Sequence, residues 1–437
     1  MVRYSDFKEL IRSFRHRSGA ALEFAEEGGE ISRIFYPELA ERILNRSREL
    51  EGFPAVRILP AEQTPETVID IFAEVIAGHD LILCDPMLET DWAEAAAEKC
   101  LAARRQQELE AGWARGEGEL LFATSGTTSR SKVVRLTSRS LCASAWSGQS
   151  MLPCGEEDRL LSVLPLSHVF GFVCSMLWGL AYGATVALGR GLRHLMEDAR
   201  FFRPTILPAV PSLIAAMVRF EVLNPELRIV LIGAAPCPEE VTEALQAAGI
   251  RVYLGYGLTE TSSGIAITQD QEEPEALYPC PGADIRIEAD GEVSVATPCM
   301  MEGYLGLAPM AAGRRFFTGD LGSFDEKGRL HLVGRKKDVL ILPDGTKIYC
   351  PEYEATLGAE VGSAELAVIL RDGHAALVAG GDVDAGMLRD AVNELNRGKL
   401  RSQQIYEILT AEEPLPRTAT GKLKRYEIQE RYNQEAQ

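Results

Sequence analysis

Small hydroxyl residues, one glycine and a lysine follow a predicted strand at residues 119–123, and they could bind phosphate. The loop reads TSGTTSRSK and ends at Lys132. Backbone N–H groups and hydroxyls in such a loop can surround phosphate oxygens while the lysine supplies positive charge. A solvated Ser/Thr turn is the alternative. A P-loop NTPase is disfavoured, because a Walker A loop needs a second glycine before the lysine and a hydroxyl residue after it.

A second segment, VYLGYGLTETSSG at residues 252–264, places Tyr256 between glycines at the end of another predicted strand. Its ring could stack on a base or bound a pocket. Thr259 and Glu260 follow and offer oxygen ligands. Mg²⁺ typically keeps several waters and binds one or two carboxylates together with substrate phosphates. The segment therefore predicts a magnesium site at Glu260, with an exposed glutamate in an ordinary turn as the alternative.

Two further segments carry charge on predicted loops. Asp320 follows a Thr-Gly turn, and Arg335 comes fifteen residues later. A carboxylate can accept from both hydroxyls of a ribose, and a guanidinium can reach the same sugar or a phosphate. Near the C-terminus, PLPRTATGKLKR presents Lys422 on a Thr/Gly loop. Taken singly, such residues are usually solvated.

In order and spacing, the four segments resemble the core motifs of the adenylate-forming superfamily, which includes acyl- and aryl-CoA synthetases, peptide-synthetase adenylation domains and luciferases. That pattern is TSGTTGxPKGV, YGxTE, TGD with a downstream GRxxD, and PRTxxGKxxR. This chain reads TSGTTSRSKVV, YGLTE, TGD with GRKKD, and PRTATGKLKR. Weaker matches are LPLSHVFGF (164–172), LIGAAPCP (231–238), GEVSVATPCMMEGY (291–304) and DGTKIYCPEYE (344–354). The resemblance covers most of the chain.

The resemblance implies a fold and a reaction. The fold is α/β, with a large N-terminal domain (residues 1–336) of two α/β subdomains plus a β-subdomain. A small mobile α+β C-terminal domain (residues 337–437) would be hinged at Lys337. The reaction is ATP- and Mg²⁺-dependent activation of a carboxylic acid to an acyl-adenylate with release of pyrophosphate, followed by transfer to a thiol.

The resemblance also implies roles for individual residues. Lys422 would bridge the acyl carboxylate and the phosphate, where it would stabilise charge as it develops. Thr259 and Glu260 would complete the catalytic set, with Glu260 as the metal ligand. The residues expected to bind ATP or AMP are Thr124, Ser125, Gly126, Thr127, Thr128, Lys132, Gly233, Ala234, Ala235, Pro236, Tyr256, Gly257, Asp320 and Arg335. The residues expected around the acid are His168, Phe170, Gly255 and Gly264.

The phosphate loop departs from the pattern at three positions. Ser129 and Val133 stand where glycine is usual, and Ser131 stands where proline is usual. Serine tolerates left-handed backbone angles less readily than glycine, so the effect of these residues on the loop stays open. A catalytically silent nucleotide-binding protein is the alternative from another functional class, but the presence of Lys422 and Glu260 argues against it.

The acid is expected to lack an amino group. Peptide-synthetase domains commonly place an aspartate in the segment aligned with LPLSHVFGF, where this chain has His168 and Phe170. No acidic residue occurs from Leu160 to Gly189. A packed core histidine is the alternative for His168. The chain contains no carrier domain, so the thiol should belong to coenzyme A or, alternatively, to an acyl or peptidyl carrier protein.

The predicted strands and helices place the motifs on an α/β scaffold. Strand patterns at residues 80–86, 228–233 and 250–257 alternate with helical patterns at 64–78, 92–114 and 238–249, which predicts an α/β domain. Ligands of parallel sheets bind in loops at the carboxyl ends of the strands. Beyond residue 278, short strands and Asp-Gly or Lys-Gly turns predict a β-subdomain, with a domain boundary at residues 336–338.

Composition excludes several functional classes. Lys plus Arg number 45 against 64 Asp plus Glu, a net charge of −19 without a basic stripe, which argues against nucleic acid as a partner. Nine scattered cysteines and a charged start without a signal sequence predict a cytoplasmic protein. Residues 160–189 lack charge but contain Pro165, His168 and four glycines. We therefore expect strand, helix and strand there, and no membrane span.

Overall fold

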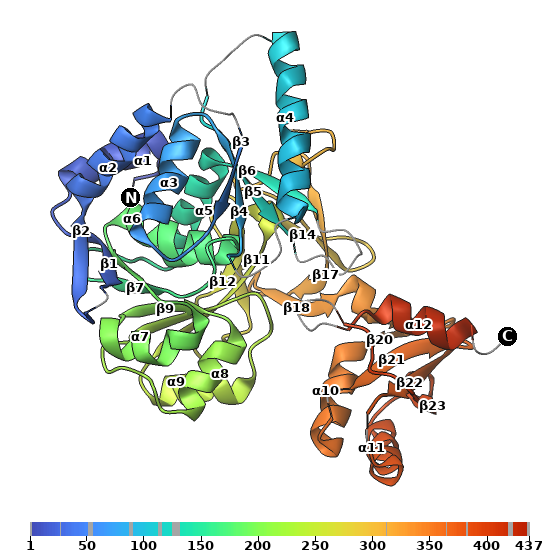
Figure 1. Cartoon of the computed structure of the whole chain (residues 1–437). Helices are drawn as coiled ribbons and strands as arrows, with labels where there is room; N and C mark the ends of the chain where they lie inside the picture. The colour runs from blue at the N-terminus through green and yellow to red at the C-terminus, as the bar shows by residue number, and fades with distance from the viewer. Residues whose placement is uncertain are drawn as a thin grey trace.

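The structure is a computed structural model of the chain. It describes residues 2–26, 28–50, 56–86, 91–111, 116–124, 132–311, 313–363, 365–381, 383–417 and 423–434. Figure 1 shows a large mixed α/β body and a smaller part, formed by the C-terminal segment, at one side of it. The predicted α/β class is confirmed.

The largest sheet runs through the body and into the β-subdomain. Within the described residues it contains thirteen strands in the order β14-β15-β17-β18-β13-β12-β11-β10-β9-β7-β8-β1-β2. The stretch from β11 to β1 is parallel, and antiparallel strands extend it on both sides. Their bounds are β1 Ala20–Ala25, β2 Ile31–Phe35, β7 Arg159–Ser162, β8 Thr185–Leu188, β9 Ile206–Ala209, β10 Ile229–Ile232, β11 Arg251–Leu258, β12 Ser263–Thr268, β13 Leu277–Pro279, β14 Asp284–Ile287, β15 Glu292–Ala296, β17 Phe316–Phe324 and β18 Leu330–Arg335.

A second sheet has the order β16-β6-β5-β4-β3 among the described strands. Strands β3, β4 and β5 are parallel, and β6 and β16 are antiparallel to their neighbours. The loop predicted to bind phosphate joins β5 to β6. The bounds are β3 Val56–Pro60, β4 Asp80–Cys84, β5 Glu119–Ala123, β6 Val133–Thr137 and β16 Gly303–Tyr304.

Helices flank these sheets and begin and end where their sequences dictate. Helix α3 starts where the Thr64 side chain accepts from the N–H of Thr67, and Pro65 occupies the first turn. Helix α9 ends just before Gly249, whose φ is +78°, as its sequence predicts. The helices of the body are α1 Phe7–Ser13, α2 Tyr36–Glu49, α3 Pro65–Ile76, α4 Asp91–Ala111, α5 Ser138–Met151, α6 Trp178–Tyr182, α7 Leu195–Phe202, α8 Pro211–Arg219 and α9 Glu239–Ala247.

The uncharged stretch 160–189 folds as strand, helix and strand, as predicted. Strand β7 leads into a π-helix, Gly171–Leu177, which continues as α6 before β8. Most of its apolar side chains are buried in the main hydrophobic cluster. Within the described residues, no helix combines the length and the apolar character that crossing a membrane requires.

Strand β11 belongs to both halves of the large sheet. Its first half pairs in parallel with β10, where Ile232 faces Leu254. Its second half pairs antiparallel with β12. A Cβ on Gly257 would lie 1.9 Å from the carbonyl oxygen of Ser263, so glycine permits this close approach of the two strands. The strand thus carries Tyr256 from the parallel sheet to the β-subdomain.

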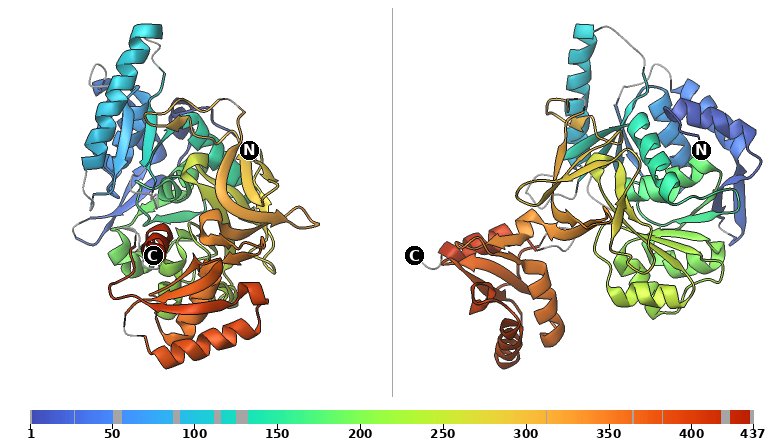
Figure 2. Two further views of the ribbon diagram at one scale, coloured as in Figure 1. Left: turned by 90° about the vertical axis from the view of Figure 1, so that its right-hand side faces the viewer. Right: turned by 180° about the vertical axis from the view of Figure 1, so that it is seen from behind.

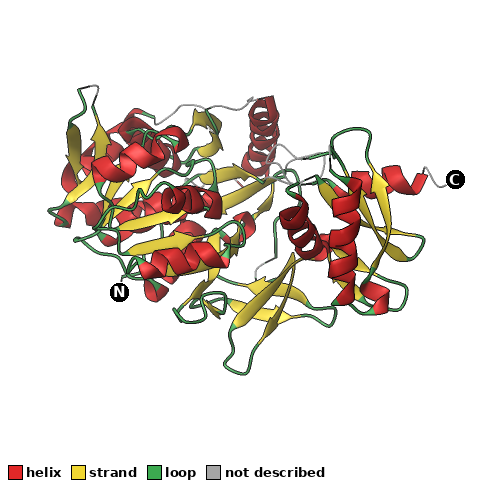
Figure 3. Ribbon diagram, turned by 90° about the horizontal axis from the view of Figure 1, so that it is seen from below, coloured by secondary structure: helices red, strands yellow, loops and turns green. Residues whose placement is uncertain are grey.

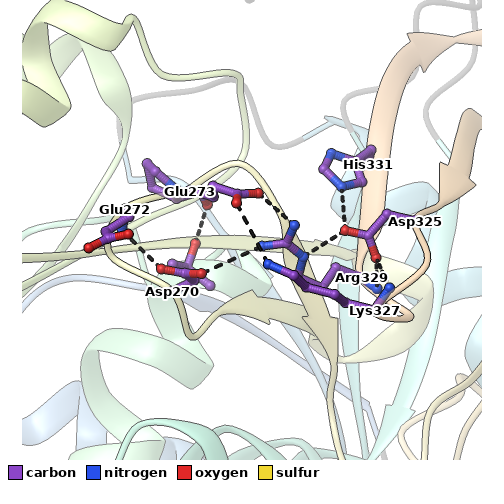
Figure 4. Close-up of polar contacts among 9 residues, drawn as sticks. Asp270, Glu272, Glu273, Asp325, Lys327, Arg329 and His331 are labelled. Atoms are coloured by element: carbon purple, nitrogen blue, oxygen red, sulfur yellow. Dashed lines mark hydrogen bonds and ion pairs between the residues drawn. The ribbon is translucent and has the colours of Figure 1, made fainter.

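Ion pairs around Arg329 fasten the β17–β18 hairpin to the connection between β12 and β13 (Figure 4). The guanidinium is 5% exposed; its Nε lies 2.7 Å from Asp325 Oδ2 and its Nη2 2.5 Å from Glu273 Oε2. His331 Nε2 lies 3.2 Å from the same oxygen of Asp325. A buried arginine needs such partners to offset the loss of water. The network holds the hairpin that carries Asp320 and Arg335.

The C-terminal part follows a short 3₁₀ helix at Lys336–Asp338, the predicted boundary. Figures 2 and 3 show it beside the body, with its helices next to its own strands. Two clusters of buried apolar residues between Leu340 and Tyr432 form its core. Its elements are β19 Val339–Ile341, β20 Lys347–Tyr349, α10 Cys350–Val361, β21 Leu366–Arg371, β22 His374–Ala379, α11 Ala385–Arg397, β23 Ile405–Thr410 and α12 Arg425–Gln434. Separate cores support the predicted two-domain division, which stays a prediction.

Candidate functional site

A buried carboxylate, Asp320, lies between a tyrosine and an arginine at the junction of the parallel sheet and the β-subdomain. The hydroxyl of Tyr256 donates to Asp320 Oδ2 at 2.7 Å. The Nε of Arg335 lies 2.7 Å from Asp320 Oδ1. Asp320 is 6% exposed, whereas the Arg335 side chain is 47% exposed. The structure therefore brings together three residues predicted for ATP binding.

The register of one hairpin sets this arrangement. Asp320 on β17 faces Arg335 on β18 across the antiparallel pair. Gly319 has φ +73°, and its N–H donates to Glu292 Oε1 at 2.9 Å. The N–H of Asp320 donates to Thr318 Oγ1 at 3.1 Å. These bonds fix the TGD turn, so the carboxylate does not depend on a ligand for its position.

Burial shapes the protonation of this group. Burial raises the pKa of Asp320, and the charges of Arg335 and Lys337 oppose that rise. Burial and the negative charge of Asp320 also raise the pKa of Tyr256. The phenol thus remains protonated and serves as a donor to the carboxylate.

A second cluster joins Glu260 to Lys132 through an aromatic ring. The hydroxyl of Tyr304 donates to Glu260 Oε1 at 2.7 Å. The Nζ of Lys132 lies 4.7 Å from the centroid of the same ring. Burial and the Glu260 charge raise the pKa of Tyr304, so the hydroxyl is a donor here too. Two residues predicted from separate motifs thereby contact one tyrosine, Glu260 at its hydroxyl and Lys132 at its ring.

The turn that presents Glu260 is tightly built. Thr259–Thr261 form a 3₁₀ turn between β11 and β12. The Thr261 hydroxyl donates to Ser263 O at 2.8 Å and accepts from Leu258 N at 3.0 Å. Ser262 and Ser263 have φ of +52° and +98°. Such angles are costly for non-glycine residues and are often found at functional sites.

The phosphate loop is described at its two ends. The N–H of Thr124 donates to Lys132 O at 2.8 Å, and its hydroxyl lies 3.2 Å from the same oxygen. These bonds close the loop at its base. The predicted phosphate ligands Ser125, Gly126, Thr127 and Thr128, together with Ser129 and Ser131, lie outside the described residues.

The turn predicted to flank adenine begins beside Tyr256. Because Ile232 pairs with Leu254, residues 233–236 follow β10 next to Gly255. Gly233 packs under the ring of Phe170, where a Cβ would lie 3.0 Å from Phe170 Cζ. Ala234 has φ +71° and is exposed, as are Ala235 and Pro236. This surface lies at the carboxyl edge of the sheet, as predicted.

The residues predicted for the acid pocket lie around the same edge. Phe170 from the β7 loop contacts Gly233, and Cys174 of the π-helix lies 3.4 Å from Ser263 Oγ on β12, next to Gly264. His168 is exposed, so the alternative of a packed core histidine is wrong. Desolvation by the surrounding protein still lowers its pKa, against an opposing effect of Asp85.

Two predicted residues belong to the C-terminal part and its hinge. Lys337 lies in the 3₁₀ helix after β18, and its charge acts on Asp320. Tyr349 of β20 packs on Gly334 of β18, where a Cβ would lie 2.1 Å from its ring. Lys422 lies outside the described residues. The catalytic role of Lys422 and the hinge role of Lys337 stay predictions.

Sequence analysis missed the residues that hold the site in place. Tyr304 was visible only as the last letter of a weak motif, and Thr318 and Glu292 were not distinguished at all. Tyr304 and Glu292 act through contacts far away in the sequence: Tyr304 reaches Glu260, and Glu292 reaches Gly319. Only its position at the end of the weak family motif at residues 291–304 could have pointed to Tyr304.

The carboxylate oxygens of Glu260 suit magnesium. One oxygen of the carboxylate accepts from Tyr304, and no hydrogen bond of its other oxygen is seen among the described residues. A hard cation that keeps most of its waters needs one or two such carboxylates. Within the described residues, including those around Glu260, no group of three or more His, Cys, Asp or Glu residues is placed to hold a metal ion by itself. The site therefore fits a metal held jointly by protein and phosphate.

Known proteins match the chain along most of its length. A family model described as AMP-binding enzyme matches residues 56–305. The 2-succinylbenzoate–CoA ligase of Bacillus subtilis (strain 168) is 30% identical over 460 residues, covering 97% of this chain and 92% of the relative. That of Listeria innocua serovar 6a is 30% identical over 335 residues, 71% of this chain and 69% of the relative. The chain belongs to the AMP-binding enzyme family.

Solved structures show the same fold. The o-succinylbenzoate CoA synthetase of Bacillus subtilis, in complex with the acyl-adenylate OSB-AMP, superposes with a TM-score of 0.77 at 24% identity and covers 98% of both chains. The anthranilate CoA ligase AuaEII, in complex with anthranoyl-AMP, gives a TM-score of 0.79 at 18% identity, covering 100% of this chain and 99% of the other. The predicted adenylate-forming fold is confirmed.

Family and motifs together define the class of reaction. The chain is an ATP- and Mg²⁺-dependent ligase that joins a carboxylic acid to a thiol through an acyl-adenylate, as its motifs predict. The alternative of a silent nucleotide-binding protein finds no support in these relatives. The acid and the individual residue roles remain to be assigned.

Proposed function

We propose that this AMP-binding enzyme activates an aromatic carboxylic acid without an amino group and transfers it to coenzyme A. The observation that carries the proposal is the preformed Tyr256–Asp320–Arg335 group, which lies beside the turn at Gly233 and Phe170. The relatives named above are CoA ligases, which favours CoA over a carrier protein. All nine cysteines are free thiols, as a reducing cytoplasm allows.

Asp320 is the ribose acceptor in this proposal. Each carboxylate oxygen has two lone pairs, so oxygens that already accept from Tyr256 and Arg335 can still accept from ribose hydroxyls. Tyr256 and Arg335 hold the carboxylate in its plane before ATP arrives. The Arg335 guanidinium is half exposed and can extend to the sugar or the phosphate.

Lys132 and the loop that starts at Thr124 bind the phosphates. Lys132 is exposed, and its ammonium contacts the ring of Tyr304. Glu260 holds the metal ion, which supplies positive charge to the phosphate oxygens when it is bound. Lys422 of the C-terminal part approaches the carboxylate and the α-phosphate during the first step. Rotation about Lys337 then exchanges Lys422 for the thiol.

The residues around Phe170 favour an aromatic acid without an ammonium group. Residues 160–189 carry no Asp, Glu, Lys or Arg. Residues 160–189, β10 and β11 contain no carboxylate that could pair with an α-ammonium, and the neighbouring Glu260 is the proposed metal ligand. An amino acid would therefore leave a charge without a partner, at high cost.

The first experiment measures pyrophosphate release with ATP and Mg²⁺ across a panel of acids. We expect release with benzoate-type acids, with 2-succinylbenzoate as the substrate suggested by the relatives, and none above background with phenylalanine. Addition of CoA should then give the acyl-CoA. Preference for an amino acid, or thioester formation only with a carrier protein, would refute the proposal.

The proposed metal ligand gives a prediction at limiting magnesium. Glu260→Gln keeps the acceptor for Tyr304 but removes the charge, so we expect the Mg²⁺ concentration for half-maximal adenylation to rise roughly ten-fold or more. Glu302→Gln is the matched control, because Glu302 is an exposed glutamate two residues from Tyr304. The measurement is the initial rate of pyrophosphate release against Mg²⁺ concentration. Equal Mg²⁺ curves for Glu260→Gln and the unaltered enzyme would remove Glu260 from the metal site.

A further inference from the structure

Tyr304 makes two different contacts with two residues of the proposed phosphate and metal site. Its hydroxyl donates to Glu260 Oε1 at 2.7 Å, and its ring lies 4.7 Å from Lys132 Nζ. The ring is half-buried. One side chain thus contacts both a predicted metal ligand and a predicted phosphate ligand.

These contacts are the ones that define the positions of both charged groups. Among the described residues, the Glu260 carboxylate has one hydrogen-bond donor, which is Tyr304. In that same part of the chain, no carboxylate oxygen lies close enough to Lys132 Nζ, within 4.0 Å, to form an ion pair. The lysine and the glutamate therefore contact different parts of one neutral residue and form no ion pair with each other.

The backbone on both sides of Tyr304 is fixed. Strand β16 pairs with β6, so Tyr304 faces Val134, two residues after Lys132. The N–H of Leu305 donates to Val133 O at 2.8 Å, and the N–H of Met301 donates to Glu260 O at 2.8 Å. The segment 301–305 therefore joins the end of the phosphate loop to the turn at Glu260, and the Tyr304 ring has little freedom to move.

We infer that Tyr304 is a positioning residue that orients Glu260 for the metal and holds Lys132 ready for the phosphates. This inference rests on the proposed function of both residues. With one oxygen held by the Tyr304 hydroxyl, Glu260 presents its other oxygen to the metal. An exposed cation–π contact is weak, so the ring restricts the Lys132 side chain while its ammonium stays available to a phosphate. A direct Lys132–Glu260 ion pair would have to be broken each time Mg·ATP binds.

The hydroxyl and the ring can be tested separately by binding measurements without turnover. Isothermal titration calorimetry measures ATP affinity in the absence of acid, with and without Mg²⁺. We expect Tyr304→Phe to reduce the Mg²⁺-dependent gain in ATP affinity roughly ten-fold, the size expected when a group that orients a metal ligand is lost. Its affinity for ATP without metal should not change. Tyr304→Leu should lower both affinities, because the contact with Lys132 is lost as well.

Two further variants decide whether Tyr304 acts through Glu260. In a double-mutant cycle, Tyr304→Phe should add nothing to the metal defect of Glu260→Gln. Tyr353→Phe is the matched control, since Tyr353 also donates its hydroxyl (to Gln403 O, 3.1 Å) and lies 4.8 Å from a lysine, Lys399. It lies in the C-terminal part and should leave both affinities unchanged.

The outcomes separate this inference from the proposed function. A normal Mg²⁺-dependent gain in Tyr304→Phe, or additive defects in the double variant, would overturn the positioning role while the unaltered enzyme still binds Mg·ATP. If the unaltered enzyme gains no ATP affinity from Mg²⁺, the metal site itself fails and the inference fails with it. Thermal unfolding of each variant confirms that a folded protein is compared.

Discussion

Lys422→Ala is expected to lower the rate of adenylate formation from acid and ATP by on the order of a hundred-fold or more. The ammonium stabilises negative charge that develops as the carboxylate attacks the α-phosphorus, so its loss raises the barrier of that step. Formation of the thioester from synthetic acyl-AMP and CoA should survive, because the C-terminal part has by then rotated and carried Lys422 away. Single-turnover rates of the two half-reactions measure both effects.

The residues on either side of the Lys422 segment supply the control for this test. Arg417 and Leu423 pair as an antiparallel bridge, and Arg417 Nη2 lies 3.0 Å from Glu365 Oε1. Lys424, two residues beyond Lys422, pairs with Glu427 at 3.0 Å. Lys424→Ala removes a nearby ammonium and should leave both half-reactions unchanged. An equal loss of the two half-reactions in Lys422→Ala, or the loss of neither, would show that Lys422 is not the adenylation lysine.

The sequence predicted the elements well because their signals are local. Helix α9 ends just before Gly249, as its sequence predicts, and the Asp372-Gly373 turn between β21 and β22 has the positive φ values that a tight hairpin requires. The alternation of strands and helices gave the α/β class for the same reason. Nothing local, however, joins β1 and β2 to β8, since that pairing spans more than 150 residues of the sequence.

The contacts within the site were also hard to predict, because they join residues far apart in the sequence. The motifs predicted Asp320, Arg335 and Tyr256 as separate ATP ligands, and the structure shows that they also bind one another. That arrangement depends on the register of β17 against β18 and on the path of β11, which are set by packing. Tyr304 escaped notice because its two partners lie 44 and 172 residues earlier in the sequence. Motifs reveal residues that contact a ligand more readily than they reveal the residues that position them.

Asp320→Asn is expected to raise the KM for ATP roughly ten-fold or more, because hydrogen bonds to a charged group contribute about 1.5–3 kcal/mol. An amide offers one oxygen, and its nitrogen must face either Tyr256 or Arg335, so one of these two residues loses its acceptor and the ribose loses a charged acceptor. Arg335 is half exposed and is rehydrated, so only a modest fall in Tm should follow. Initial rates against ATP concentration, with thermal unfolding in parallel, measure both quantities.

Asp325→Asn, at the other end of the same hairpin, is expected to affect stability rather than ATP affinity, in contrast with Asp320→Asn. Asp325 accepts from Arg329 Nε at 2.7 Å, the same distance as in the Asp320–Arg335 pair. Arg329, however, is buried, and Figure 4 shows it among Asp325, Asp270 and Glu273. Asp325→Asn removes one of three carboxylates that compensate the buried Arg329 charge and leaves Asp270 and Glu273. Because weakening a buried ion-pair network is costly, this variant should lose more in Tm than Asp320→Asn and keep its KM for ATP. If both variants instead lost stability and kept their KM, Asp320 would be a structural residue of the β17–β18 hairpin and the ribose would be held elsewhere.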